Sequence, residues 1–177
     1  SQHLYRSEHF IIQMNNKVYD SKVLQLFFDD PEGAYHIREI ARQTKLHPNT
    51  VLRDVKLLVD EELLTKKTTK AIVEVRANRE NPLFTTLKRL NNLRALYLSG
   101  LVDALNKEYT APEAIILFGS YSRGEDTKRS DIDIAVITKR KISPDLSKYR
   151  SMLHREIQIL ETDLKDSSKE FITNLAN

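Results

Sequence analysis

Two neighbouring stretches decide the fold: Phe118-Gly119-Ser120-Tyr121-Ser122-Arg123-Gly124 and Ser130-Asp131-Ile132-Asp133-Ile134-Ala135-Val136-Ile137. The first contains the end of the short apolar run Ala114–Phe118, which is typical of a buried strand that ends at a glycine. In the second, three β-branched residues alternate with Asp131, Asp133 and Ala135. A period of two predicts a second strand whose isoleucines and valine face the core.

The turn after the first strand has the composition of a phosphate-binding turn. Gly119 allows the backbone to turn tightly and to approach a ligand closely, because it has no Cβ. Ser120 adds a hydroxyl and a backbone N–H, and helix N-termini favour anions such as phosphate. Arg123 follows about one helical turn later, so its guanidinium is a candidate for bidentate phosphate contact.

The second strand is predicted to place two carboxylates next to each other. Asp131 and Asp133 project from the same face, and a divalent cation relieves their repulsion. Mg²⁺ typically binds one or two carboxylates together with substrate phosphate oxygens. The arrangement suits metal-assisted phosphoryl or nucleotidyl transfer.

Each half of this pattern is common by itself. A lone Gly-Ser after a strand is an ordinary turn, and a lone Asp-x-Asp at a strand edge is often only solvated. The joint pattern, with Arg123, Gly124 and Ser130 also present, is far more specific and points to chemistry on a nucleoside triphosphate.

These residues resemble the signature of the polymerase-β-like nucleotidyltransferase superfamily, and the closest type is the minimal nucleotidyltransferase domain of prokaryotes. The resemblance covers roughly residues 98–177. It implies an α/β fold with a short mixed sheet flanked by helices, and transfer of a nucleoside monophosphate from an NTP to a hydroxyl with Mg²⁺ or Mn²⁺. It also implies that Gly119, Ser120, Arg123 and Ser130 hold the nucleotide, and that Asp131 and Asp133 bind metal.

One position departs from that family pattern. Active members usually carry a third carboxylate on a later strand, which here is predicted at Arg155–Glu161. The central residue on the site-facing side is Gln158, whose amide cannot accept a proton at neutral pH. Glu156 is the candidate catalytic substitute, one strand repeat away, whereas Glu161 requires a register shift. Catalysis and nucleotide binding without turnover therefore both stay open.

Composition places the chain among soluble globular proteins. It has 177 residues, 40% hydrophobic and 30% charged, with a net charge of +3. The absence of cysteine excludes disulfides and thiol chemistry and fits a cytoplasmic location. No apolar run approaches the roughly 18 residues of a membrane span, and no signal peptide is visible. We therefore expect no membrane partner.

Residues 15–80 show a second pattern, of three helices and a hairpin. The helices are expected around Val23–Phe28, over Tyr35–Thr44, and from Pro48 onward with Val51, Leu52, Val55, Leu58 and Val59 on one face. Two β-rich runs follow, with a lysine-rich tip between them. This order resembles a winged helix-turn-helix domain of prokaryotic transcription regulators. The resemblance implies DNA binding and transcription regulation.

In such domains the third helix reads base edges in the major groove, and wing residues contact phosphates. The resulting DNA-binding candidates are His47, Asn49, Thr50, Arg53 and Lys56 on the helix, and Lys66, Lys67 and Lys70 on the wing. The alternative is a protein-interaction module, because lysines on hairpins are often only solvated and protect sheet edges. Residues 1–80 carry 13 Lys/Arg against 12 Asp/Glu, so DNA binding would depend on local patches.

Residues 81–110 are predicted to form a helical connector, in one helix or in two with a break at Gly100. It either packs on both domains or pairs with a second copy in a homodimer. The nucleotidyltransferase domain is predicted over 111–177. The sequence thus predicts a cytoplasmic, DNA-binding nucleotidyltransferase that uses Mg²⁺ and NTP; a toxin-like partner protein is one candidate acceptor. The alternative is a transcription regulator whose C-terminal domain binds nucleotide or a partner protein without turnover.

Overall fold

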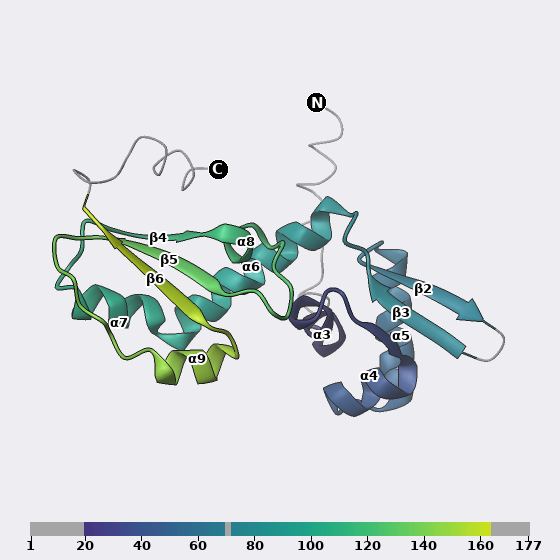
Figure 1. The fold of residues 1–177 in the computed structure, drawn as a ribbon. Coiled ribbons are helices and arrows are strands. Elements are labelled where there is room, and N and C mark those ends of the chain that lie inside the picture. Colours follow the sequence, from purple (N-terminus) through teal and green to yellow (C-terminus); the bar gives the residue numbers. More distant parts are fainter. Residues whose placement is uncertain (1–19, 70–71, 164–177) are drawn as a thin grey trace. The chain divides into compact units, whose positions relative to one another are not determined.

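The structure is a computed structural model that describes residues 20–69 and 72–163. The chain divides into two compact units, Ser1–Phe84 and Thr85–Asn177. Each unit contains one three-stranded sheet with helices (Figure 1). None of the helices in the described ranges is both long enough and apolar enough to cross a membrane.

The described residues of the N-terminal unit form helices and an antiparallel sheet. Its elements are α3 (Lys22–Asp29), β1 (Ala34–His36), α4 (Ile37–Thr44), α5 (Pro48–Asp60), β2 (Leu64–Thr69) and β3 (Ile72–Ala77). The strands lie in the order β1-β3-β2, with both pairs antiparallel. The predicted order of three helices and a hairpin is confirmed.

Local sequence explains where these helices begin and end. The Ser21 hydroxyl accepts a hydrogen bond from the backbone N–H of Leu24 and so caps α3. Lys45, with φ of 57°, ends α4 in the left-handed conformation, and Pro48 occupies the start of α5, where its missing N–H has no consequence. Val51, Val55 and Leu58 form the buried stripe of α5.

Two expectations for this unit were wrong. Tyr35 and His36 do not begin a helix but form β1, because their backbone pairs with Val75 and Glu74 of β3 and the Tyr35 ring is buried. Leu52 does not face the core; it is 50% exposed, since it lies about 100° around the helix from Val51.

The C-terminal unit is built around a mixed sheet. Its strands are β4 (Ala114–Phe118), β5 (Ile132–Ile137) and β6 (Ile157–Thr162), and its helices are α7 (Leu101–Glu108), α8 (Gly119–Arg123), α9 (Ser147–Leu153) and most of α6 (Pro82–Ser99). Gly100, with φ of 76°, separates α6 from α7, so the predicted break is confirmed. The strand order is β4-β5-β6; β4 runs antiparallel to β5, and β6 runs parallel to it.

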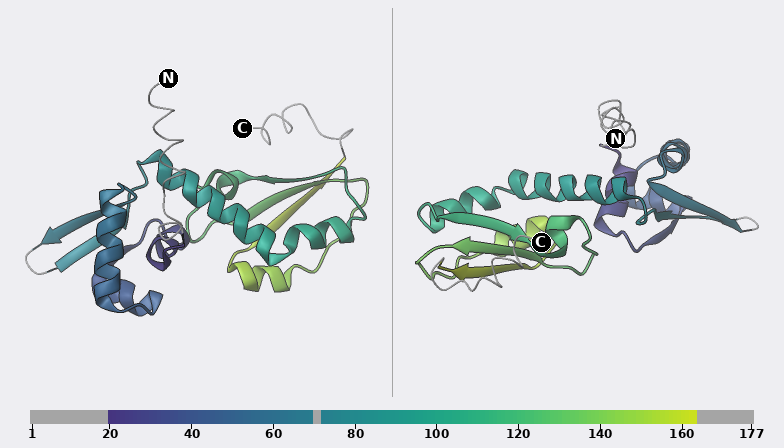
Figure 2. Two further views of the ribbon diagram at one scale, coloured as in Figure 1. Left: turned by 180° about the vertical axis from the view of Figure 1, so that it is seen from behind. Right: turned by 90° about the horizontal axis from the view of Figure 1, so that it is seen from above.

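The core of this unit lies on one face of the sheet. Ile132, Ile134 and Val136 of β5 are buried there against Leu96, Leu101 and Leu105 of α6 and α7, and α9 adds Tyr149 and Leu153. Figure 2 shows α6 and α7 along one face of the sheet. The alternation predicted for β5 is therefore confirmed. The strand β4, expected to be buried, is half-buried along its length because it is an edge strand.

Candidate active site

The two sequence stretches that suggested a nucleotide site meet at one end of the C-terminal sheet. The antiparallel register places Phe118, the last residue of β4, opposite Asp133 of β5. Gly119 therefore begins α8 directly beside that carboxylate. A Cβ on Gly119 would lie 2.3 Å from Asp133 Oδ2, and its φ is 72°. Both the close approach and the left-handed conformation require glycine at this position.

The two aspartates lie close enough to influence each other. Asp131 immediately precedes β5 and Asp133 lies within it, both partly buried. Burial raises the pKa of Asp133 above its usual value, and the negative charge of Asp131 raises it further. The predicted repulsion between the two carboxylates is therefore present. A cation bound between them would relieve it.

Asp131 and Asp133 suit a divalent ion that takes its other ligands from the substrate. In the described ranges, no group of three or more His, Cys, Asp or Glu side chains could hold a metal. Mg²⁺ commonly uses one or two protein carboxylates and completes its octahedron with phosphate oxygens and water. Asp131 and Asp133 match that donor set, provided that a triphosphate supplies the other ligands.

Gln158 lies beside the aspartates, as the sequence indicated. The parallel register pairs it with Asp133, and its amide Nε2 donates to Asp131 Oδ2 at 3.3 Å. Glu156 precedes β6, is 67% exposed and forms an ion pair with Arg150 Nε at 3.2 Å. Glu161 is excluded from the site, because its carboxylate accepts bonds from the Tyr109 hydroxyl and the Ile142 backbone N–H.

The remaining nucleotide-binding candidates have local partners. Arg123 is exposed, and its Nε lies 2.8 Å from Glu125 Oε2. Ser130 Oγ accepts a hydrogen bond from the Thr127 backbone N–H at 2.9 Å, which shapes the loop before Asp131. Ser120 is partly buried in α8. Gly119 and Ser120 are thus the candidates placed at the carboxylates by the backbone itself.

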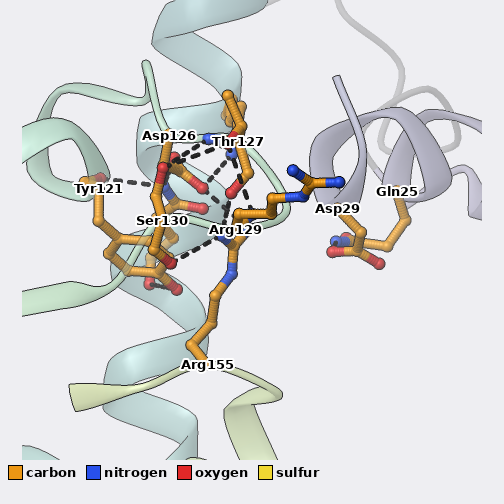
Figure 3. A network of polar contacts seen from close by, with 10 residues as sticks. Gln25, Asp29, Tyr121, Asp126, Thr127, Arg129, Ser130 and Arg155 are labelled. Carbon is orange, nitrogen blue, oxygen red and sulfur yellow. Dashed lines mark hydrogen bonds and ion pairs between the residues drawn. The ribbon is translucent and has the colours of Figure 1, made fainter. Parts of the chain in front are cut away.

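A buried charge network that sequence analysis missed holds the loop between α8 and β5. Asp126 is fully buried, and one carboxylate oxygen lies 2.7 Å from Lys88 Nζ and 3.0 Å from an Arg155 nitrogen. The Asn92 amide donates to the other oxygen at 2.7 Å. Arg155 also donates to the backbone carbonyls of Thr127 and Ser130 (Figure 3).

The network brings α6, this loop and the start of β6 to one point. Its only sequence signal was Lys88, a charge one residue after Leu87 and four after Phe84 on the apolar side of a helix. Gly124 adds a close backbone contact, since a Cβ there would lie 2.4 Å from the Thr85 carbonyl oxygen. The segment that leads to Asp131 is therefore fixed from both ends.

The DNA-binding candidates lie on the N-terminal unit. His47 caps α5 by accepting from the Asn49 backbone N–H through Nδ1, and both residues are exposed. Arg53 and Lys56 are exposed on the same helix and pair with Asp54 and Asp60. Thr50 is half-buried, Lys66 and Lys67 are exposed on β2, and Lys70 lies outside the described residues.

Comparisons with known proteins agree with the geometry of the C-terminal site. Residues 101–176 match a nucleotidyltransferase domain. The matching family model is described as "Polymerase beta, Nucleotidyltransferase". A curated protein of Methanocaldococcus jannaschii named "Putative protein adenylyltransferase" is 39% identical over 62 residues, which make up 35% of this chain and 62% of that protein. The chain thus spans less than two thirds of that relative. No solved structure matches the present chain.

Proposed function

We propose that the C-terminal unit transfers a nucleoside monophosphate from an NTP to a hydroxyl group, with Mg²⁺ or Mn²⁺ as cofactor. The observation that carries this proposal is the contact between Gly119 and Asp133. It sets a glycine turn, suited to phosphate, against a carboxylate pair suited to a cation. The family match over residues 101–176 supports the same reaction class.

In the proposed reaction, the acceptor oxygen forms a bond to the α-phosphorus while the bond to the bridging oxygen of the β-phosphate breaks, and pyrophosphate leaves. The bound ion would neutralise charge on the phosphates and orient them. The backbone at Gly119 and Ser120 would hold the triphosphate, and Asp131 and Asp133 would hold the ion.

Gln158 orients Asp131 through its hydrogen bond but cannot take the acceptor's proton. Because Asp131 and Asp133 would hold the ion, Glu156 is the carboxylate at this end of β6 that remains for that step.

The acceptor is proposed to be a side-chain hydroxyl of a protein. The curated name of the similar archaeal protein specifies protein adenylylation for that relative. A partner protein as acceptor also agrees with the exposure of the β6 edge, where Gln158 and Leu160 are both exposed.

The decisive experiment follows label from [α-³²P]ATP or [α-³²P]GTP into added protein acceptors. The double variant Asp131→Asn/Asp133→Asn should lower transfer by at least about 100-fold, because it removes both proposed metal ligands. Glu113→Gln, an exposed carboxylate that precedes β4, is the matched control and should leave transfer unchanged. Equal labelling by the double variant and the wild type would refute the proposal.

For the N-terminal unit we propose a winged helix that binds DNA. Support comes from the helix order, the hairpin β2–β3 and the exposed cations Arg53, Lys56, Lys66 and Lys67. In this arrangement α5 enters the major groove and β2 contacts phosphate. Binding to duplex DNA at low salt, measured by fluorescence anisotropy, should weaken steeply as salt rises, since phosphate contacts release counterions.

The second candidate function is a regulator that binds nucleotide without turnover. It is favoured by Gln158, which we propose stands where active relatives carry a third carboxylate. Under this alternative, Mg·ATP alters DNA affinity while no label is transferred. The substitution Gln158→Asp tests why transfer is absent under this alternative. A variant Gln158→Asp that gains transfer, while Gln158→Ala gains none, would identify an enzyme that lacks only its third acid.

A further inference from the structure

A pocket of about 440 Å³ adjoins Asp131, and Gly119 is not among the residues that line it. It is lined by residues 128–131, by Arg150 and Ser151 of α9, and by residues 154–156. Asp131 thus belongs to the lining of the pocket and also to the carboxylate pair. Pockets of this size hold a few side chains or a small molecule.

The pocket carries an excess of positive charge. Its lining includes four Lys or Arg side chains, Lys128, Arg129, Arg150 and Arg155, against the two carboxylates of Asp131 and Glu156. Arg150 pairs with Glu156 within the lining, and Arg155 pairs with the buried Asp126 behind it. Lys128 and Arg129 are both exposed. Such a surface attracts an anionic ligand.

The walls of the pocket are held in place before any ligand arrives. Arg155 donates to the Ser130 carbonyl at 3.0 Å and to the Thr127 carbonyl. These two residues stand directly before and after Lys128 and Arg129, so the loop is anchored on both sides of the two cations. The same guanidinium is fixed by Asp126 (Figure 3). A preformed site loses less conformational entropy when it binds.

The strand order separates the pocket from the phosphate turn. Gly119 approaches Asp133 from the β4 side of β5, whereas Arg155 and Glu156 precede β6 on the opposite side. The carboxylates therefore lie between the proposed donor site and the pocket. Transfer in line requires acceptor and leaving group on opposite sides of the reacting phosphorus.

We propose that this pocket selects the acceptor, and that the acceptor is a protein hydroxyl flanked by acidic residues. The neighbouring carboxylates of the acceptor pair with Lys128 and Arg129, which brings the hydroxyl to Asp131. This inference rests on the proposed function, because it deepens the choice of acceptor at the same site.

The test measures binding and transfer separately. Three labelled peptides of equal length each contain one tyrosine. The residue before the tyrosine and the residue after it are both aspartate, both asparagine or both lysine. Binding to the full chain is followed by fluorescence anisotropy in 50 mM and 300 mM salt, without nucleotide. We expect the aspartate peptide to bind at least about 10-fold more tightly than the asparagine peptide at low salt, with a smaller difference at high salt.

The double variant Lys128→Gln/Arg129→Gln should remove that preference. Lys139→Gln/Lys141→Gln, which changes two exposed lysines outside the pocket lining, is the matched control and should retain it. Equal affinity for the aspartate and asparagine peptides, or equal loss in both variants, would overturn the inference. A single-stranded oligonucleotide that binds more tightly than the aspartate peptide and depends on Lys128 and Arg129 would overturn it as well.

Transfer from ATP to the bound peptide is then assayed. Selective binding without transfer would contradict the proposed enzymatic function but leave the acidic-peptide pocket in place. Transfer that is equal for all three peptides would support the enzyme and contradict the pocket's role in selection.

Discussion

The two units of this protein differ in the ion pairs that their described residues form. In the described part of the N-terminal unit, the ion pairs lie at the surface, as in Arg53–Asp54, where the arginine side chain is 75% exposed, and Lys56–Asp60. In the C-terminal unit, Lys88 and Asp126 are 1% and 0% exposed and share their site with Arg155.

The difference separates recognition from positioning. Exposed pairs contribute about 0–1 kcal/mol each, so their side chains can exchange an intramolecular partner for a ligand at little cost. A buried cluster has a large desolvation penalty and is tolerated only in one geometry. The N-terminal charges are thus suited to contact a partner, whereas the buried C-terminal ones fix the loop that leads to Asp131.

The largest effect is expected from Asp126→Asn. The variant leaves Lys88 and Arg155 buried without their carboxylate, so the free energy of unfolding should fall by about 3–5 kcal/mol. Urea denaturation followed by circular dichroism measures this loss. Glu125→Gln, at the adjacent exposed position, is the control and should cost less than about 0.5 kcal/mol. Similar losses in the two variants would break the contrast between buried and exposed ion pairs.

This network also marks the limit of prediction from sequence. The strands β4 and β5, the Gly119 turn and the adjacency of Gln158 to the aspartates follow from local periodicity and from a motif, and the structure confirms them. Asp126 lies in a polar loop, and its burial depends on Lys88 and Arg155, which are 38 and 29 positions away. Local patterns contain no information about such distant pairing.

The error at Tyr35 has the same origin. Helical spacing suggested that Tyr35 begins α4, but the pairing partner of β1 is β3, about 40 residues later. A strand of three residues is too short for a period of two to be recognised in the sequence, and it is stabilised by its pairing with the distant strand β3. The Tyr35 hydroxyl donates to Asp30 at 2.6 Å, a contact that no sequence pattern indicated.

Two tyrosines permit a matched test of hydrogen bonding in the two units. Tyr35 donates to Asp30, and Tyr109 donates to Glu161 at 2.7 Å; burial and these bonds raise the pKa of both phenols. Tyr35→Phe and Tyr109→Phe should each lower stability by about 1.5 kcal/mol, the typical contribution of a hydrogen bond to a charged group. Thermal unfolding by calorimetry would show whether each variant shifts one transition or both. A shift of neither transition would show that the bonds contribute nothing.

A smaller effect of opposite sign is expected from Asp133→Asn. Because the folded-state pKa of Asp133 is raised, its ionised form is disfavoured in the folded protein above the usual aspartate pKa. Removing the charge should therefore increase stability at pH 7 by roughly 0.5 kcal/mol without added metal.

The pH dependence gives the control for this variant. As pH falls through the raised pKa, wild-type Asp133 takes up a proton and the advantage of the variant should disappear. Denaturation at a series of pH values between 4 and 8, each at one salt concentration, measures the difference. A variant less stable than wild type at pH 7 would contradict the repulsion between Asp131 and Asp133.

The smallest effect on stability is expected from Arg53→Gln. Its ion pair with Asp54 is exposed, so the free energy of unfolding should change by less than about 0.5 kcal/mol. If α5 contacts DNA, the same variant should weaken DNA binding. Where the contact is to phosphate, the slope of log affinity against log salt concentration should fall in magnitude by about one. Gln43→Ala, an exposed position on α4, is the control. Unaltered DNA affinity in Arg53→Gln would favour the protein-interaction alternative for this unit.

The parallel pairing of β5 with β6 has a consequence for the order of folding. The strands β4 and β5 can pair across the single loop that contains α8, whereas β6 can join only after the chain has crossed over through α9. Closing the longer connection costs more chain entropy, so it is expected to follow the antiparallel pairing. The glycine turn and both aspartates would then meet first, and Gln158, whose amide donates to Asp131, would reach them last.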